Sequence, residues 1–514
     1  MTTHRPLVLA ILDGWGIAPP SAGNAVTQAK TPVLDAWQKK YPHTELQASG
    51  LAVGLADGQD GNSEAGHMNL GAGRVVPQDD SRISQSISNG TFFRNPAFLA
   101  AIHHVKKHHS TLHLMGMFGN TQSAHANPDH LLALLLLAHN HQLRNVRLHL
   151  FTDGRDSPRF YAREIMTKFL PHFGDATVAT VMGRFYAMDR NKDWDRTAQA
   201  YRAIVLGQAA HHVREPLDAI TQAYNRGESD EFIQPTVVGN YQGVEDHDAV
   251  IFFNLRSDRA RQLTKAFVQS DFERSNAATK PFTRPKVVTD LTFVAMTDFG
   301  PDLDSILTAY PAVALADTFP MALKDRRQLY IAESEKYAHV TYFFNGGYAN
   351  PVGGEDREMI PSPPVLTYDL APAMNSVKLT DRVIDVLAHR LYDVVVMNYA
   401  NTDMVAHTGN LPAGIQAMEA TDTCLGRLAA AVLAVDGWLV VTGDHGNLEE
   451  MRNLATGEVD TEHSTFPVPF FLIGRQATPL QLRPGVLGDV APTLLHLLGH
   501  PIPPAMTGHL LIQP

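Results

Sequence analysis

The chain has 514 residues, of which 44% are hydrophobic, and 53 acidic residues outnumber 42 lysines and arginines to give a formal net charge of −11. Domains mostly contain about 100 to 200 residues, so we expect two or more. The negative charge argues against a nucleic-acid surface, because phosphate backbones are bound by clustered Lys and Arg.

The apolar segments give no sign of a membrane. Only six apolar residues follow the first arginine in MTTHRPLVLAILDGWG, too few for the core of a signal peptide. The longest apolar run, residues 131–138, is far below the ~20 residues that cross a bilayer. The one cysteine, Cys424, lies in an apolar helical pattern, so we expect a buried thiol in a reducing compartment. We therefore expect a cytoplasmic protein.

Short β-branched runs alternate with helical patterns along the chain, which predicts an α/β protein with mainly parallel sheets flanked by helices. Toward the two ends of the chain, strands are expected at residues 7–12, 312–317, 340–345, 393–399, 437–443 and 468–474. In the middle they are expected at residues 111–118, 146–152, 176–183, 249–255 and 291–297. Ligands of open α/β sheets bind beyond the carboxyl ends of strands, so the residues there indicate where sites form.

The expected strands near the two ends of the chain are followed by aspartate and histidine. The metal-capable residues are Asp13, Asp403, His407, Asp444 and His445, with His463 in an adjoining loop. Carboxylates mixed with imidazoles suit manganese, zinc or magnesium. They exceed what one ion needs, so we expect two ions about 3.5 to 4 Å apart.

Each of these residues also has a plainer interpretation. Asp403 and His407 share a helical face at their i, i+4 spacing, but they also fit a helix cap followed by an exposed histidine. Asp13 and the GDHGN segment around Asp444 also fit turns. The coincidence of all of them at strand ends or adjoining loops of one sheet region favours a metal site.

Ser63 lies in GNSEAGHMNLGAG, between turn residues and a stretch compatible with a short helix. A phosphorylated serine at a helix N-terminus is stabilised by unpaired amides and the positive end of the dipole, whereas a plain N-cap is the alternative. A metal ion beside the hydroxyl would lower its pKa and make it a nucleophile. Together these residues predict metal-assisted phosphoryl or sulfuryl transfer.

The expected strands of the middle segment are followed by arginine instead. The set is Arg155 with Asp156, then Arg184, Arg190, Arg256 and Arg259. The arginine fork matches two oxygens of a phosphate or carboxylate, so the set could clamp a small, doubly anionic molecule, although each alone also fits a solvated salt bridge. Lys336 could neutralise charge on a transferring phosphoryl group or lie at the surface.

The metal-capable residues come from both ends of the chain, so the segment between them must leave their domain and return. We expect a discontinuous domain, residues 1–77 and 305–514, interrupted by a second domain, residues 78–304. Clusters of Pro, Gly and Asp that are typical of linkers lie at residues 73–81 and 296–305.

The run HHVKKHH, residues 103–109, is the densest group among 25 histidines and looks like a metal site. It lies on a polar helical stretch, and no carboxylate is near it in the sequence. We therefore interpret it as a solvated helix face.

Eight segments together resemble the 2,3-bisphosphoglycerate-independent phosphoglycerate mutases. They are GNSEAGHMNLGAGR, TDGRDSP, GRFYAMDRNKDW, NLRSDRARQ, IAESEKYAHVTYFFNGG, NTDMVAHTG, TGDHGN and EHSTFPVPF, in the family's order over nearly the whole chain. The resemblance implies an alkaline-phosphatase-like domain interrupted by an α/β phosphotransferase domain. It also implies interconversion of 3-phosphoglycerate and 2-phosphoglycerate through a phosphoserine, without 2,3-bisphosphoglycerate.

The resemblance also implies roles for particular residues. Ser63 would be the phosphorylated nucleophile and lie among the metal ligands, with Asp13, Asp444 and His445 sharing one manganese ion and Asp403, His407 and His463 the other. The substrate contacts would be His125, Arg155, Asp156, Arg184, Arg190, Arg256, Arg259 and Lys336. Asp156 would exchange protons with the substrate hydroxyls. The chain departs from the family in a longer loop, GNTQSAHANPDH, around His125 and in Ser257, where proline is common.

Two other functions fit parts of the pattern. A metal-dependent phosphatase or sulfatase would use the same metal site and release free phosphate or sulfate. A noncatalytic phosphometabolite sensor would use the same arginines and show tight binding without turnover. We expect a monomer with a small-molecule substrate and no nucleic-acid or membrane partner. Manganese is the expected metal, and the ligands also suit zinc, cobalt or magnesium.

Overall fold

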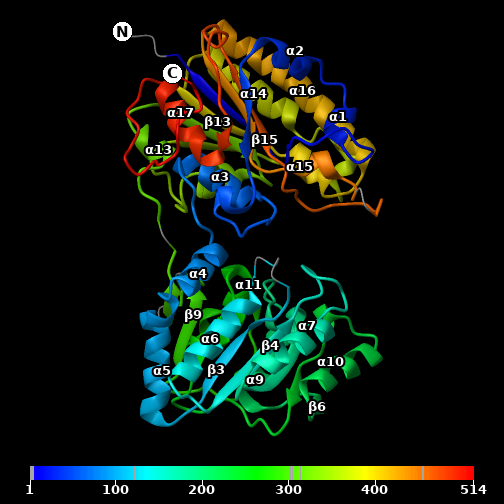
Figure 1. Ribbon diagram of the computed structural model, residues 1–514, viewed down its shortest axis with the longest axis vertical. Coiled ribbons are helices and arrows are strands. Elements are labelled where there is room, and N and C mark those ends of the chain that lie inside the picture. Colours follow the sequence, from blue (N-terminus) through cyan, green and yellow to red (C-terminus); the bar gives the residue numbers. More distant parts are fainter. Residues whose placement is uncertain are drawn as a thin grey trace. The chain divides into compact units, whose positions relative to one another are not determined.

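The computed structural model describes residues 5–120, 123, 125–300, 302–303, 305–312, 314–453 and 456–513. The chain divides into two compact units: unit 1 is Met1–Gln78 with Val313–Pro514, and unit 2 is Asp79–Ala312. In Figure 1, dark-blue elements from the start of the chain lie among yellow-to-red elements from its end, so both ends build unit 1. This confirms a discontinuous α/β unit interrupted by a second one. The boundaries expected at residues 77/78 and 304/305 stay a prediction for the functional domains.

The sheet of unit 1 has eight strands in the order β12-β11-β13-β1-β14-β15-β2-β16. Their bounds are β1 (Leu7–Leu12), β2 (His43–Gln47), β11 (Gln328–Glu333), β12 (Asp356–Ile360), β13 (Val394–Tyr399), β14 (Trp438–Gly443), β15 (Val468–Ile473) and β16 (Gly485–Val486). Only β15 among them runs against the others. Every residue of β1, β11, β13 and β14 is buried, as expected for parallel strands covered on both faces.

The helices of unit 1 come from both ends of the chain and are tied together by side chains. They are α1 (Ala25–Gln28), α2 (Pro32–Lys40), α3 (Ser63–Ala72), α13 (Phe319–Ala322), α14 (Ser376–Ala388), α15 (Asn401–Ala406), α16 (Leu411–Ala434) and α17 (Val490–Leu497). Asp422 of α16 accepts from the amides of Val33 (3.1 Å) and Leu34 (2.9 Å) in the first turn of α2. A carboxylate there satisfies unpaired amides and the positive end of the helix dipole.

The sheet of unit 2 also has eight strands, in the order β10-β9-β8-β3-β4-β5-β7-β6. They are β3 (Leu112–Met117), β4 (Val146–Thr152), β5 (Thr177–Gly183), β6 (His211–Val213), β7 (Thr236–Val238), β8 (Ala249–Phe252), β9 (Thr292–Thr297) and β10 (Leu307–Tyr310). The pair of β5 and β7 is antiparallel and the other pairs are parallel. The helices are α4 (Asp79–Ser88), α5 (Pro96–His108), α6 (Pro128–Asn140), α7 (Ala162–Phe169), α8 (Arg184–Ala187), α9 (Trp194–Leu206), α10 (Pro216–Asn225), α11 (Ser257–Val268) and α12 (Phe272–Ser275).

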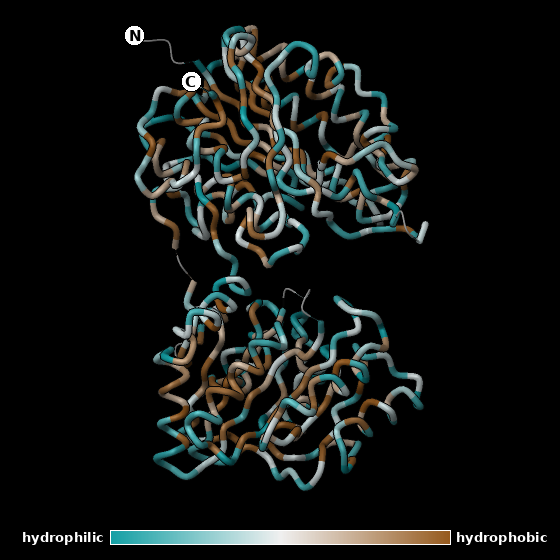
Figure 2. Tube along the Cα trace, in the orientation of Figure 1, coloured by the Kyte–Doolittle hydropathy of each residue, from teal (hydrophilic) through white to brown (hydrophobic). Residues whose placement is uncertain are grey.

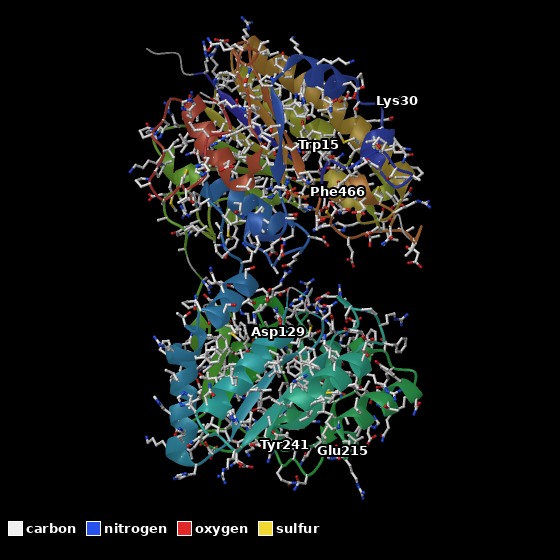
Figure 3. The ribbon with its side chains drawn as sticks, viewed as in Figure 1. Trp15, Lys30, Asp129, Glu215, Tyr241 and Phe466 are labelled. Atoms are coloured by element: carbon white, nitrogen blue, oxygen red, sulfur yellow. The ribbon has the colours of Figure 1, made fainter. Side chains whose placement is uncertain are left out.

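Each unit has its own hydrophobic core. Figure 2 shows hydrophobic stretches along the central strands of both units and hydrophilic ones in the loops around them. In unit 1 the indole of Trp15, labelled in Figure 3, stacks on Phe471 with ring centroids 6.2 Å apart. Cys424 is buried in the same core, as predicted. Among the described residues no helix combines the length and apolar character needed to cross a membrane.

Two expected strands are wrong. The described residues of 312–317 form no strand, and most of 340–345 belongs to a π-helical turn, η6 (His339–Phe343). Lys336 therefore follows β11 and precedes η6. A short apolar run has the same composition in a buried strand and in a buried helical turn, so its sequence could not separate them.

Helix α3 approaches its neighbours closely because it carries glycine at the contacts. A Cβ atom on Gly66 would lie 2.5 Å from the carbonyl oxygen of Asp444, and one on Gly71 would lie 1.9 Å from that of Phe344. Both distances are far below a carbon–oxygen contact, so any larger residue would push the helix away. Gly66 thus lets α3, whose first residue is Ser63, lie against the end of β14, and Gly71 lets it lie against the residue after η6.

Replacing Gly71 by alanine is expected to lower the free energy of unfolding by about 1 to 3 kcal/mol, because the backbone of α3 must move. Gly426→Ala in α16 is the control: the atoms nearest its Cβ belong to the Val33 side chain, the closest at 2.9 Å, and this side chain can shift. Alanine also favours a helix interior by about 0.5 to 1 kcal/mol. Denaturant unfolding measures both, and equal losses would contradict the close-packing argument.

Candidate active site

The carboxyl ends of four neighbouring parallel strands bring charged side chains to one edge of the unit 1 sheet. Asp13 follows β1, Asp444 follows β14, Asp403 lies in α15 after β13, and Lys336 follows β11. All four are at most 5% exposed. Residues far apart in sequence therefore meet because their strands are neighbours in the sheet.

The hydroxyl of Ser63 lies among these groups. Its Oγ donates to Asp13 Oδ1 at 3.1 Å, lies 2.9 Å from His445 Nε2 and accepts from Lys336 Nζ at 2.8 Å. The N-cap of α3 is Asn62, whose side chain accepts from the amide three residues on. Ser63 is therefore not the cap, and its hydroxyl is held by the charged groups beside the positive end of the helix dipole.

Asp403, His407 and His463 form one part of the cluster. Asp403 Oδ1 lies 3.3 Å from His407 Nε2 and 3.5 Å from His463 Nε2, and the two Nε2 atoms are 3.2 Å apart. His407 is the C-cap of α15 and still has a helical backbone, so its i, i+4 spacing places it on the face of Asp403. Asn447 also donates to Asp403 Oδ1, at 2.8 Å. Nitrogen and oxygen ligand atoms thus converge at the distances expected around one cation.

Asp13 and Asp444 form the other part, together with His67. Ligand atoms of these three residues lie within 4.8 Å of one another, and the three are fully buried. His445 Nε2 lies 3.4 Å from Asp13 Oδ1 and 3.6 Å from Asp444 Oδ2, and His445 also groups with Asp403 and His463. Asp444 Oδ2 is buried and lies 3.1 Å from His67 Nδ1. A cation bound among these ligand atoms would balance the charge of the two buried carboxylates.

The charges of the cluster hold one another in place. Burial opposes a charge on His445, but Asp444 and Asp13 outweigh it and raise its pKa to about 10. Burial also opposes a charge on Lys336, whose pKa the carboxylates of Asp13 and Asp403 nevertheless raise above the ordinary value. Lys336 in turn keeps the pKa of Asp403 well below its ordinary value despite burial. Carboxylates this deeply buried require positive charge, so the donor set fits divalent metal ions.

A second cluster lies at the carboxyl ends of the unit 2 strands. Arg184, the first residue of α8, is 2% exposed and forms ion pairs with Asp153 and with Asp156, the latter at 2.9 Å. Asp156 Oδ2 also accepts from Ser123 Oγ at 3.0 Å and lies 3.9 Å from His125 Nε2. The guanidinium of Arg184 is thus fixed between two carboxylates.

A cavity of about 300 Å³ lies beside Arg184. Its lining includes five arginines, Arg155, Arg184, Arg190, Arg196 and Arg259, whereas His125 and Arg256 are not among the lining residues. Arg190 donates to Asp258 at 2.8 Å, and Arg256 Nε lies 3.5 Å from the same carboxylate. Arg259 donates to the carbonyl oxygen of Met188 at 3.3 Å. This locally positive cavity in an acidic protein can hold a small anion.

Two groups beside Arg184 have shifted pKa values. Burial and the charge of Arg184 lower the pKa of His125 to about 3, so its imidazole is neutral. Burial would raise the pKa of Asp156, but Arg184 outweighs burial and lowers it. Asp156 is therefore a carboxylate at neutral pH and can accept a proton.

Sequence reasoning missed four residues of these clusters. Asn398 donates to Asp13 Oδ2 at 2.7 Å, and Asn447 contacts Asp403. His67 contacts Asp444, and Asp153 pairs with Arg184. The sequence offered a signal for two of them. His67 lies one helical turn after Ser63, and Asp153 directly follows β4 just as Asp13 directly follows β1. The two asparagines had none, because amides at strand ends are common turn residues.

Comparisons with known proteins agree with this architecture. Residues 5–502 match the family described as the Metalloenzyme superfamily. A curated 2,3-bisphosphoglycerate-independent phosphoglycerate mutase from Chloroflexus aggregans is 48% identical, with 100% of this chain and 99% of the relative covered. One from Shewanella halifaxensis is 43% identical, with the same coverage.

A solved structure of the Leishmania mexicana phosphoglycerate mutase, described at low cobalt concentration, has a TM-score of 0.76 and 30% identity to this chain. The alignment covers 99% of this chain and 98% of that one. These matches extend over both units rather than over one of them. The chain therefore belongs to the metalloenzyme superfamily and, within it, to the family of 2,3-bisphosphoglycerate-independent phosphoglycerate mutases.

Proposed function

We propose that the protein interconverts 3-phosphoglycerate and 2-phosphoglycerate through a phosphoserine at Ser63, without 2,3-bisphosphoglycerate. One observation carries the proposal: the buried Ser63 hydroxyl lies within hydrogen-bond distance of Asp13, His445 and Lys336. The substrate follows from the names of relatives that are 43% and 48% identical over the full chain. Those names disfavour a general phosphatase or sulfatase.

The residues of unit 1 would hold two divalent ions, which we propose are manganese. The ligands would be Asp13, Asp444 and His445 for one ion and Asp403, His407 and His463 for the other, with Ser63 beside both. Ions bound there would lower the pKa of the serine hydroxyl and offset charge on the phosphoryl oxygens.

The chain's own groups would then carry the transfer. The Ser63 oxygen forms a bond to phosphorus while the bond from phosphorus to the substrate hydroxyl oxygen breaks, and the reverse step delivers phosphorus to the other hydroxyl. The Lys336 ammonium, 2.8 Å from the Ser63 oxygen, offsets charge that spreads over the phosphoryl oxygens.

The residues of unit 2 would retain glycerate between the two steps. The hydroxyl that loses phosphorus must gain a proton, and the hydroxyl that attacks must lose one, so we assign this exchange to Asp156. In the free protein Arg184 keeps Asp156 ionised. A substrate carboxylate that pairs with Arg184 would weaken this effect and let Asp156 hold the proton.

We further propose that the enzyme is cytoplasmic and that it is a monomer. Light scattering can check that it is a monomer.

Replacing Ser63 by alanine is expected to lower mutase turnover at least about 1,000-fold, because no other described hydroxyl contacts Lys336. Turnover is measured with 3-phosphoglycerate, without bisphosphoglycerate, and mass spectrometry of the wild type tests for phosphoserine. Ser376→Ala is the control, since Ser376 is also a buried serine at the start of a helix of unit 1. Substantial turnover by the Ser63 variant would exclude the covalent route.

Replacing Arg155 or Arg259 by methionine is expected to lower kcat/KM about 10- to 100-fold, the usual loss for a charged hydrogen bond. Free phosphate should make up a larger share of the product, because glycerate escapes before the second transfer. Arg214→Met, at an exposed position of unit 2, should leave both quantities unchanged. An unchanged product ratio in the first two variants would argue against retention of glycerate by the cavity.

Chelator treatment should abolish turnover, and manganese should restore it better than zinc, cobalt or magnesium. The raised pKa of His445, about 10, means that the metal-free site binds a proton at pH 7.5. Metal must displace that proton, so affinity should rise as the pH rises toward 10. Titration calorimetry in buffers of different ionisation enthalpy counts released protons. Heats that do not depend on the buffer would contradict this assignment.

A further inference from the structure

A second group of histidines lies in unit 2, within the run that the sequence suggested to be a solvated face. His104 and His108 are one turn apart near the end of α5 and are half-buried. The fold brings them to Asp290, in the turn before β9, and to His247, in the loop before β8. The carboxylate missing from the neighbouring sequence is therefore supplied by a distant loop.

These four side chains are in close contact. Ligand atoms of His104, His108 and Asp290 all lie within 4.8 Å of one another. His247 Nδ1 lies 2.6 Å from Asp290 Oδ2, and His108 Nε2 lies 3.9 Å from the same oxygen. The rings of His104 and His108 have centroids 4.7 Å apart. Small rotations of the side chains would bring the ligand atoms to the distances around one ion.

This cluster lies away from the arginine cavity of the same unit. His108, His247 and Asp290 shortly precede β3, β8 and β9, so they mark the amino ends of three parallel strands. The arginine cavity lies at the carboxyl ends. Figure 3 labels one residue near each edge: Asp129 in the first turn of α6, after β3, and Tyr241 in the loop that leads to His247. Asp129 lies above Tyr241 in this view.

The loops that carry the ligands are held by hydrogen bonds. Ser110 Oγ donates to the carbonyl oxygen of His247 at 2.6 Å, and the amide of His247 donates to that of Thr289 at 3.2 Å. Asp246 accepts from the amide of Thr289 at 2.8 Å. His247 and Asp290 have left-handed backbones, with φ of +68° and +49°. The two loops are therefore joined to each other and to the end of α5, which fixes the positions of the side chains.

The ligand atoms of the cluster suit a cation. His104 Nε2 is buried without a hydrogen-bond partner among the described residues. Metal ions bind neutral histidine through the lone pair of a ring nitrogen. One carboxylate, Asp290, adds the negative charge that a divalent ion prefers.

We propose that His104, His108 and Asp290 bind one divalent transition-metal ion of the zinc or nickel class, outside the active site. Two imidazoles and a carboxylate supply three ligands, and water would complete a tetrahedral site. The ring of His247 is parallel to that of His108, at 2° and 4.6 Å, so both cannot aim their lone pairs at the same point. His247 instead donates to Asp290 and orients it. The ion would link the end of α5 to the loops before β8 and β9.

Counting bound ions tests the proposal. The full-length protein is stripped with chelator, equilibrated with zinc and analysed by plasma mass spectrometry. His104→Gln with His108→Gln should remove one ion per chain relative to the wild type, whatever number the active site holds. The control is His103→Gln with His109→Asn, which removes two exposed histidines of the same run and should keep the wild-type count. An equal count in both double variants overturns the proposal.

Two single variants guard against misfolding. Asp290→Asn keeps the shape of the side chain and tolerates a positive φ, and it should also lose one ion. His247→Asn should keep the ion but weaken zinc binding about 10- to 100-fold, as changes to ligand-orienting partners do. Mutase turnover of all variants should equal that of the wild type. Zinc binding by Asp290→Asn with wild-type affinity would refute the site. Unchanged zinc affinity in His247→Asn would refute the proposed role of His247 in orienting Asp290.

Discussion

The burial of several carboxylates at one sheet edge is the constraint on which the rest of unit 1 depends. A buried ion without a partner costs several kcal/mol. The pairs of Lys336 with Asp13 at 2.6 Å and with Asp403 at 2.7 Å therefore stabilise the fold only if both carboxylates come to the same ammonium group. The chain must bring β1, β11 and β13 together for this to occur. Charge balance and strand order thus support one another.

That strand order explains how a second unit can interrupt the first. β1 lies between β13 and β14, so the first residues of the chain complete a sheet made mostly by the last ones. The chain leaves unit 1 after α3, forms unit 2 and returns to unit 1 before β11. Unit 2 has a buried core of its own. An insertion between these elements changes no strand neighbour in unit 1. The phosphoryl-transfer cluster and the arginine cavity can therefore each be built at the carboxyl ends of parallel strands within its own unit.

The sequence predicted those parts of the site that follow directly from strands. Asp13 and Asp444 each come directly after a long apolar run, and the run predicts the strand. The sequence predicts a strand at residues 340–345, after Lys336, whereas the structure has β11 before Lys336 and a π-helical turn after it. Its partners could not be predicted from local pattern, since they depend on which strands are neighbours. The family resemblance implies that Lys336 contacts the substrate. Only the structure shows that Lys336 also contacts Ser63.

The histidine run shows the same limit from the opposite direction. No carboxylate lies near His104 and His108 in the sequence, whereas the fold places Asp290 beside them.

The two metal-capable clusters differ in how deeply their ligands are buried. In the active-site cluster Asp13, Asp444 and His445 are fully buried beside the Lys336 ammonium group, so an ion bound by them must displace a proton and lose most of its water. The second cluster is half-exposed and its carboxylate pairs with a histidine, so an ion can bind while it keeps water. We therefore expect the second site to exchange its ion faster than the active site does.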